Sequence, residues 1–200
     1  MNIIYLPLLV YLVSSVLLVI LYHKSSIKDK VMLPTISLTG QHILNNDISY
    51  YSYLVSFIIL SICAFIFYMK CISVPNKKVY SIILLLGITA CILNIVQGIY
   101  AIDKDREIHE KTAYGGIFLH LVALSIYLYI SKHDKKVTYI VIGSWLSVIL
   151  HQLFLATFNS HSGVVIYSSN MSLSSVFQRL CVCLLIVTAT MISKGNTCFK

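Results

Sequence analysis

The chain has 200 residues, of which 58% are hydrophobic and only 11% are charged, and its formal net charge is +8. Because a soluble domain carries roughly 25% charged residues, this composition excludes a water-exposed globule. The basic residues are spread between the apolar runs, so they indicate membrane-flanking anchors and not a nucleic-acid-binding surface.

Six apolar runs follow one another along the chain. A helix rises ~1.5 Å per residue, so ~20 apolar residues cross the ~30 Å hydrocarbon core of a bilayer. The runs lack the two-residue alternation of a membrane β-strand. We therefore predict an all-α, polytopic membrane protein, a single six-transmembrane-helix bundle over residues 1–200, in which the first run is a retained helix. The predicted spans are residues 3–22, 49–69, 79–101, 113–131, 137–158 and 172–193.

The charges between the predicted spans favour one orientation. Of the 15 Lys and Arg residues, eight fall on the side that holds both termini and six on the opposite side, so the positive-inside rule predicts both termini in the cytosol. The Asn-x-Ser sequence at Asn170 then falls on the lumenal side, close to the last span, which makes it a weak candidate for glycosylation. None of the six cysteines falls in a lumenal segment, so no disulfide framework is predicted.

Polar side chains fall inside the last four predicted spans, where such groups are costly and their placement is informative. Asn94, His120, His151 and Arg179 each lie seven residues from the lumenal end of their span, which predicts a common polar layer about 10 Å below the surface. The residues of this candidate site are Asn94, Gln97, His120, His151, Gln152, Gln178 and Arg179.

Arg179 is the most informative member of this set. An arginine at the centre of a spanning helix costs about 2.5–3.5 kcal/mol on insertion scales, and no Asp or Glu occurs in the predicted spans. It must extend to the membrane surface, pair with an acidic residue between spans such as Asp103 or Glu107, or meet an external anion. Two interpretations stay open: the polar groups hold the bundle together by hydrogen bonds, or they bind membrane lipids, with an anionic headgroup or a small anion at Arg179.

Redox and metal chemistry have little support in the sequence. Haem held between helices needs facing axial ligands, and His120 and His151 are the interior histidines, so at most one haem fits. No local cluster of metal-type ligands predicts zinc, and no nucleophile elbow, phosphate-binding glycine loop or HExxH motif occurs. We therefore predict no catalytic residues, no metal and no cofactor, and a haem-binding membrane oxidoreductase is the least favoured alternative.

The polar stretch LPTISLTG, residues 33–40, interrupts the apolar chain between the first two spans. It resembles the first lumenal loop of the damage-regulated autophagy modulator (DRAM) and Frag-type six-span membrane proteins, which runs Pro, one residue, Ile-Ser-Asp-Thr-Gly. Leu38 stands where that family has the acidic residue. Proline and glycine at its ends predict an ordered turn that folds over the lumenal polar layer. The matching residues are Pro34, Ile36, Ser37, Thr39 and Gly40.

A second stretch, EIHEKTAYGG, is similar to the His-x-x-x-Ala start of the fourth span in that family and places His109 and Ala113 in the motif. The resemblance covers roughly residues 1–130. It implies a non-enzymatic endomembrane protein, lysosomal by kinship, that promotes autophagy through membrane lipids or unidentified protein partners, with no nucleic-acid partner. The alternative is a Frag-like factor of the Golgi or plasma membrane that handles lipids or GPI anchors.

Overall fold

The computed structural model describes residues 5–24, 36, 47–102, 104–131, 135–159 and 169–195, with the side chains of 47, 155–159 and 169–172 excepted. Over these residues the chain is helical and has no strand. All six long helices have the length and hydropathy to cross a membrane, which confirms the predicted all-α six-helix bundle. They are α1 (Leu6–Lys24), α3 (Asp47–Lys70), α4 (Lys77–Ile99), α5 (Arg106–Ser131), α6 (Lys135–Asn159) and α7 (Ser169–Gly195).

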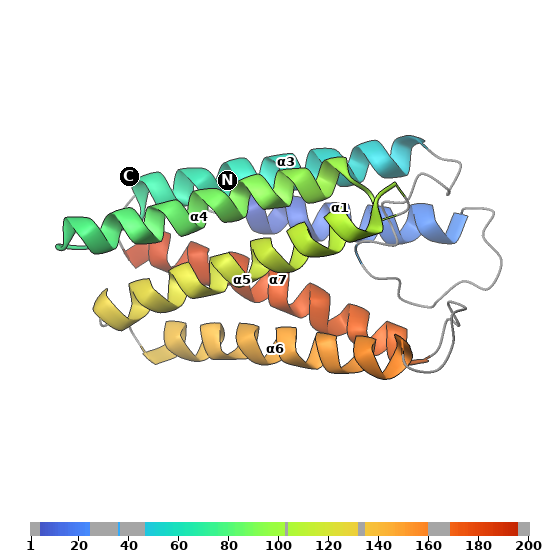
Figure 1. Ribbon diagram of the computed structural model, residues 1–200. Coiled ribbons are helices and arrows are strands. Elements are labelled where there is room, and N and C mark those ends of the chain that lie inside the picture. The colour runs from blue at the N-terminus through green and yellow to red at the C-terminus, as the bar shows by residue number, and fades with distance from the viewer. Residues whose placement is uncertain are drawn as a thin grey trace.

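The helices run lengthwise beside one another (Figure 1) and pack in two groups. In the first group α4 packs on both α3 and α5, and α1 packs on α3. In the second group α6 packs along α7. Contact between the groups, through α5 with α6 and through α7 with α1 and α3, is much sparser. The interior of the bundle is therefore least filled where α1 and α3 face α7.

Helix ends fall within about three residues of the predicted spans, except at the start of α5. Asp105 caps that helix, because its carboxylate accepts a hydrogen bond of 3.0 Å from the backbone N–H of Ile108. Arg106 and Glu110 add an exposed ion pair of 2.7 Å one turn apart. The helix therefore begins well before the predicted span at residue 113, since hydropathy alone does not detect a charged first turn.

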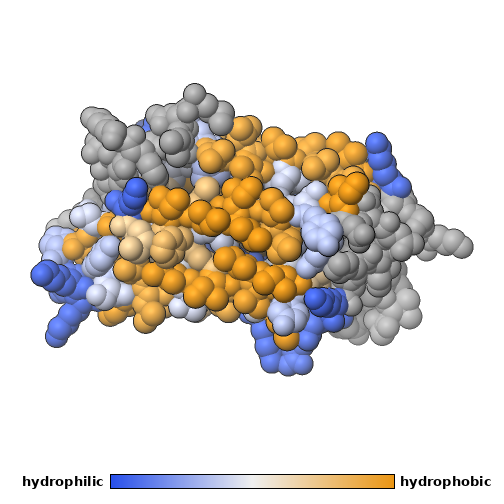
Figure 2. Space-filling view, turned by 90° about the horizontal axis from the view of Figure 1, so that it is seen from above, coloured by the Kyte–Doolittle hydropathy of each residue, from blue (hydrophilic) through white to orange (hydrophobic). Residues whose placement is uncertain are grey.

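The outer surface of the bundle is apolar, as a lipid-facing surface must be. Figure 2 shows hydrophobic residues covering the middle of the molecule, with hydrophilic residues towards its two ends. Large side chains such as Leu85, Phe118 and Leu153 are exposed on it. In a soluble protein such a continuous patch would be a binding surface or an aggregation hazard, whereas in a bilayer it contacts acyl chains.

The start of α1 and the end of α7 lie at the same end of the bundle. The Lys194 Nζ is 5.4 Å from the centre of the Tyr5 ring, within the range of a cation–π contact. A chain that crosses a bilayer six times must have the start of its first helix and the end of its last helix on the same side. Its placement on the cytosolic side remains a prediction from the charge distribution.

Candidate functional site

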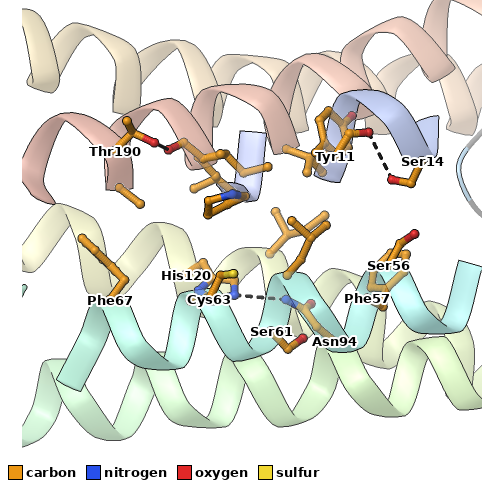
Figure 3. Close-up of a pocket in the computed structure, with 18 of the residues that line it drawn as sticks. Tyr11, Ser14, Ser56, Phe57, Ser61, Cys63, Phe67, Asn94, His120 and Thr190 are labelled. Atoms are coloured by element: carbon orange, nitrogen blue, oxygen red, sulfur yellow. Dashed lines mark hydrogen bonds between the residues drawn. The ribbon is translucent and has the colours of Figure 1, made fainter. Parts of the chain in front are cut away.

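A central cavity of about 250 Å³ lies where α1 and α3 face α7, with α4 and α5 contributing to its wall (Figure 3). It follows α7 from Arg179 to Ser193, about 21 Å at a rise of ~1.5 Å per residue. Most of its wall is apolar. Five of the seven polar residues predicted from the sequence line it: Asn94, Gln97, His120, Gln178 and Arg179.

Arg179 ties α7 to α1 at one end of the central cavity. Its Nη1 donates a hydrogen bond to Ser15 Oγ, and the Tyr11 hydroxyl donates to the backbone carbonyl of Arg179 at 3.0 Å. Both partners come from α1, and the bond to Ser15 holds the guanidinium in the wall beside that helix. The part of the wall that the structure describes contains no Asp or Glu.

Gln178 connects the same end of the cavity to the stretch LPTISLTG. Its Oε1 accepts a hydrogen bond of 2.9 Å from the backbone N–H of Ile36, and the buried Ile36 side chain contributes to the cavity wall. The stretch therefore contacts the candidate site at Ile36. The other matching residues of the stretch, Pro34, Ser37, Thr39 and Gly40, lie outside the described residues.

A hydrogen-bonded cluster of Tyr68, His120 and Asn94 lies in the wall nearer the middle of the cavity. Asn94 Nδ2 donates to His120 Nε2 at 3.0 Å, and His120 Nδ1 shares a hydrogen bond of 3.0 Å with the Tyr68 hydroxyl. The Tyr68 and His120 rings are stacked, 5.7 Å apart and 7° from parallel. Both ring nitrogens of His120 are thus engaged within the protein, which is the pattern of a structural histidine.

Two glycines make room for this cluster. A Cβ on Gly87 would lie 2.5 Å from Cγ of the Tyr68 ring, and a Cβ on Gly116 would overlap the Asn94 carboxamide. Small residues let neighbouring helices approach closely enough for polar groups to bond across the gap. The glycines therefore fix the register of α3 on α4 and of α4 on α5.

That register separates two residues that were predicted to share one depth. Asn94 packs beside Gly116, so His120, four residues further along α5, lies one turn deeper. In Figure 3 His120 lies nearer the middle of the cavity than Ser14 and Ser56 do. The predicted depth of His120 is its distance along the chain from residue 113, and that distance contains no information on how α5 is placed along α4.

His151 and Gln152 lie apart from the central cavity. They line a second cavity of about 250 Å³ between α5, α6 and α7. His151 Nδ1 is 2.7 Å from the hydroxyl of Ser174 on α7, so it joins the two helices of the second group. Gln178 lines both cavities, which are therefore neighbours. Of the seven predicted residues, five line the central cavity, and His151 and Gln152 line the second cavity alone.

His109 and Ala113 of the second resemblance motif lie at the connection between α4 and α5. Nδ1 of the buried His109 donates a hydrogen bond of 2.8 Å to the backbone carbonyl of Tyr100, which closes the connection. Ala113 is buried on the same face of α5. Neither lines the central cavity. Asn170 falls in the first turn of α7, and its side chain lies outside the described part of the chain.

The described residues do not assemble a metal centre. No three His, Cys, Asp or Glu side chains among them are placed to hold a metal ion. His120 and His151, the two interior histidines, line different cavities and have different hydrogen-bond partners. They do not face each other as a pair of axial haem ligands would.

Sequence reasoning missed the tyrosines of the cavity region. Tyr53 is fully buried and accepts a hydrogen bond of 3.3 Å from Gln97 Nε2, while Tyr11 and Tyr68 bond to Arg179 and His120. A tyrosine buried in a helix bundle carries a hydroxyl that needs a hydrogen-bond partner. This signal is present in the sequence, and it points to the same interior as the amides and the arginine.

Comparisons with protein-family models, with curated proteins and with solved structures find no match to this chain. The resemblance to the autophagy modulators therefore depends on the motif residues alone.

Proposed function

We propose that this protein binds a lipid inside its helix bundle and acts through that lipid, or through partner proteins, without catalysing a reaction. The observation that supports this is the central cavity, which is apolar along most of its length and has the Arg179 guanidinium at one end. One leaflet contributes about half of the ~30 Å hydrocarbon core, or about 15 Å. A cavity about 21 Å long therefore has room for an acyl chain lying along α7.

The two interpretations left open by the sequence apply to different residues. Tyr68, His120 and Asn94 satisfy one another, so bundle stabilisation accounts for them. Arg179 lines the apolar cavity beside α1, and an anionic headgroup bound at its guanidinium is the interpretation that we propose for it. The proposed lipid site is therefore centred on Arg179 and not on the histidines.

Native mass spectrometry of the purified protein with its co-purifying lipids tests this proposal. The wild type is expected to retain an anionic lipid, and Arg179→Leu to lose it. Arg106→Leu is the matched control, because Arg106 is exposed and pairs with Glu110. An Arg179→Leu protein that folds and retains the same lipid would contradict the proposal. If that variant fails to fold, loss of lipid in Arg179→Gln, which keeps a polar partner for Ser15, gives the same comparison.

A second candidate, an autophagy modulator of the lysosomal membrane, follows from the resemblance to the DRAM family. The observation that favours it is the position of Ile36, where the matching stretch meets Gln178 and the central cavity. A Frag-like factor would use the same site in the Golgi or plasma membrane. Imaging the tagged protein against organelle markers, with autophagic flux measured after depletion, separates the two. Lysosomal signal and lowered flux favour the modulator, and Golgi signal with unchanged flux argues against it.

A further inference from the structure

The charges of the chain are divided unequally between the two ends of the bundle. The end at which α4 and α6 begin and α7 finishes is called the basic end here. In sequence, eight Lys residues and one acidic residue, Asp134, stand at or beyond the helix ends on this side, which gives it a net charge of +7. Six Lys or Arg and six Asp or Glu residues belong to the opposite end, whose net charge is zero. With Arg179 inside the bundle, these charges account for the whole net charge of +8.

The lysines of the basic end surround one part of the core. The starts of α4 and α6 lie at the same end of the bundle (Figure 1). Val79, next to the lysine pair of α4, and Val137, next to the lysine pair of α6, belong to one apolar cluster with Ile192 near the end of α7. The six described lysines here all have exposed side chains, and they are Lys70, Lys77, Lys78, Lys135, Lys136 and Lys194. The basic end is therefore one surface and not a set of separate charges.

Two lysine pairs on this surface stand where a positive charge is unfavourable for the helix. The N-terminus of a helix carries a partial charge of about +0.5. Helix α4 begins with Lys77 and Lys78, α6 also begins with two lysines, and neither helix has an acidic residue in its first turn. Lys77 and Lys78 form no ion pair with a described residue. By contrast, α5 begins at the opposite end with Asp105 as its cap and Glu107 in its first turn. Local rules are broken in this way mainly where function requires it.

Exposed tyrosines place the basic end at the depth of the lipid headgroups. Tyr129 near the end of α5 is 87% exposed, and Tyr139 near the start of α6 is 67% exposed. Tyrosine rings on the outside of membrane proteins concentrate at the headgroup level. Lys135 precedes Tyr139 by four residues, so it starts ~6 Å further from the bilayer centre. The ammonium groups therefore meet the headgroups of the surrounding leaflet.

We propose that the basic end binds anionic phospholipid headgroups of the leaflet around it, with the lysine pairs of α4 and α6 as the main contacts. Charge complementarity selects the partner, because the surface has a net positive charge and lies in a layer of phosphates. The sequence predicts this end in the cytosol, and the cytosolic leaflet is the one rich in anionic lipids. The proposed surface is outside the central cavity and does not depend on what that cavity binds.

Quenching of tryptophan fluorescence by lipids with brominated acyl chains measures this preference in the full-length protein. Trp145 is the single tryptophan, and it lies on α6, ten residues or ~15 Å deeper in the bilayer than Lys135. For α4, Leu85→Trp in a Trp145→Phe background puts the reporter at a lipid-exposed position seven residues after Lys78. Brominated phosphatidylserine and brominated phosphatidylcholine are compared, because their headgroups differ by one net negative charge. The ratio of their binding constants is read at each reporter.

A basic residue beside an anionic surface contributes about 1 kcal/mol, which is about a fivefold preference. Phosphatidylserine should therefore bind about five times more strongly than phosphatidylcholine at both reporters. The ratio should fall to about one in ~1 M NaCl, where the Debye length is ~3 Å. Neutralising the pair next to the reporter should have the same effect, through Lys77→Gln with Lys78→Gln on α4 or the corresponding double change on α6. Lys104→Gln with Lys111→Gln, at the opposite end, is the matched control and should leave the ratio at about five.

Each other outcome overturns the inference in a different way. A ratio of about one in the wild type would show that the basic end does not select lipids. Loss of the preference when inorganic phosphate is added at constant ionic strength would show a site for free anions. A ratio of one, together with binding of soluble polyglutamate that the lysine changes abolish, would assign the surface to an acidic protein. The lysine variants keep the residues of the central cavity, so none of these results decides the function proposed above.

Discussion

Helix α4 approaches α3 closely at Gly87, and replacing this glycine by alanine tests the architecture. The new Cβ would lie 2.5 Å from Tyr68 Cγ and 2.6 Å from the two Cδ atoms of the ring. Carbon atoms in contact are normally about 3.5–4.0 Å apart, so the ring must retreat by roughly 1 Å. Cγ is the base of the ring and not a flexible tip, and Tyr68 is only 1% exposed. The two helices must therefore separate.

The expected cost of Gly87→Ala has three parts. Overpacking a well-packed interior costs about 1–3 kcal/mol. The retreating ring also strains or breaks the bond between Tyr68 and His120, and a hydrogen bond between membrane helices averages about 0.6 kcal/mol. Alanine gains about 1 kcal/mol over glycine in helix propensity, which opposes these losses. The free energy of unfolding should fall by a net of roughly 0.6–2.6 kcal/mol.

Unfolding of the purified protein by SDS in mixed micelles measures this change. Gly143→Ala is the matched control, because its Cβ would meet Leu184 Cδ1 at 3.4 Å, an ordinary contact with the end of a flexible side chain. It should be as stable as the wild type or more so. In a Tyr68→Ala background, where the ring is absent, Gly87→Ala should lose most of its cost. If Gly87→Ala is as stable as Gly143→Ala, the packing of α3 on α4 described above is wrong.

Three further changes are read in the same unfolding experiment. Ser61→Ala should raise the free energy of unfolding by about 1 kcal/mol, because Ser61 is only 2% exposed and its hydroxyl has no hydrogen-bond partner among the described residues. A lower free energy of unfolding would show that the hydroxyl has a partner. Ser174→Ala should lower stability by about 0.6–1.7 kcal/mol through loss of the bond to His151, and an unchanged value would refute that contact. Arg106→Leu should change stability by less than about 0.5 kcal/mol, since its ion pair with Glu110 is exposed to solvent, and a larger loss would show a buried role.

The number and position of the helices follow from hydropathy, because the bilayer sets the length of an apolar run. The start of α5 does not, because Arg106 and Glu107 stand in its first turn and mask the helix from a hydropathy window. Asp105 signals the true start as an N-cap, and a search for capping residues upstream of the apolar run finds it.

The candidate site was predictable in part. An arginine in a span without acidic residues identifies Arg179 from the sequence alone, and adjacent Gln178 lies in the same cavity wall. The division between the two cavities was not predictable, because it depends on how α6 and α7 rotate about their own axes. His151 bonds to Ser174 across that helix pair, and a count of depth along each span contains no information on rotation.

Tyr11 and Ser15 of α1 form hydrogen bonds with Arg179 of α7. The two α1 residues precede Arg179 in the chain by 168 and 164 positions. A growing chain that has inserted only α1 to α5 already possesses Tyr68, His120 and Asn94, but not Arg179, which is the one Lys or Arg among the described residues of the cavity wall. The central cavity is thus completed only when α7 packs on α1, so it forms after the other five described helices have been made.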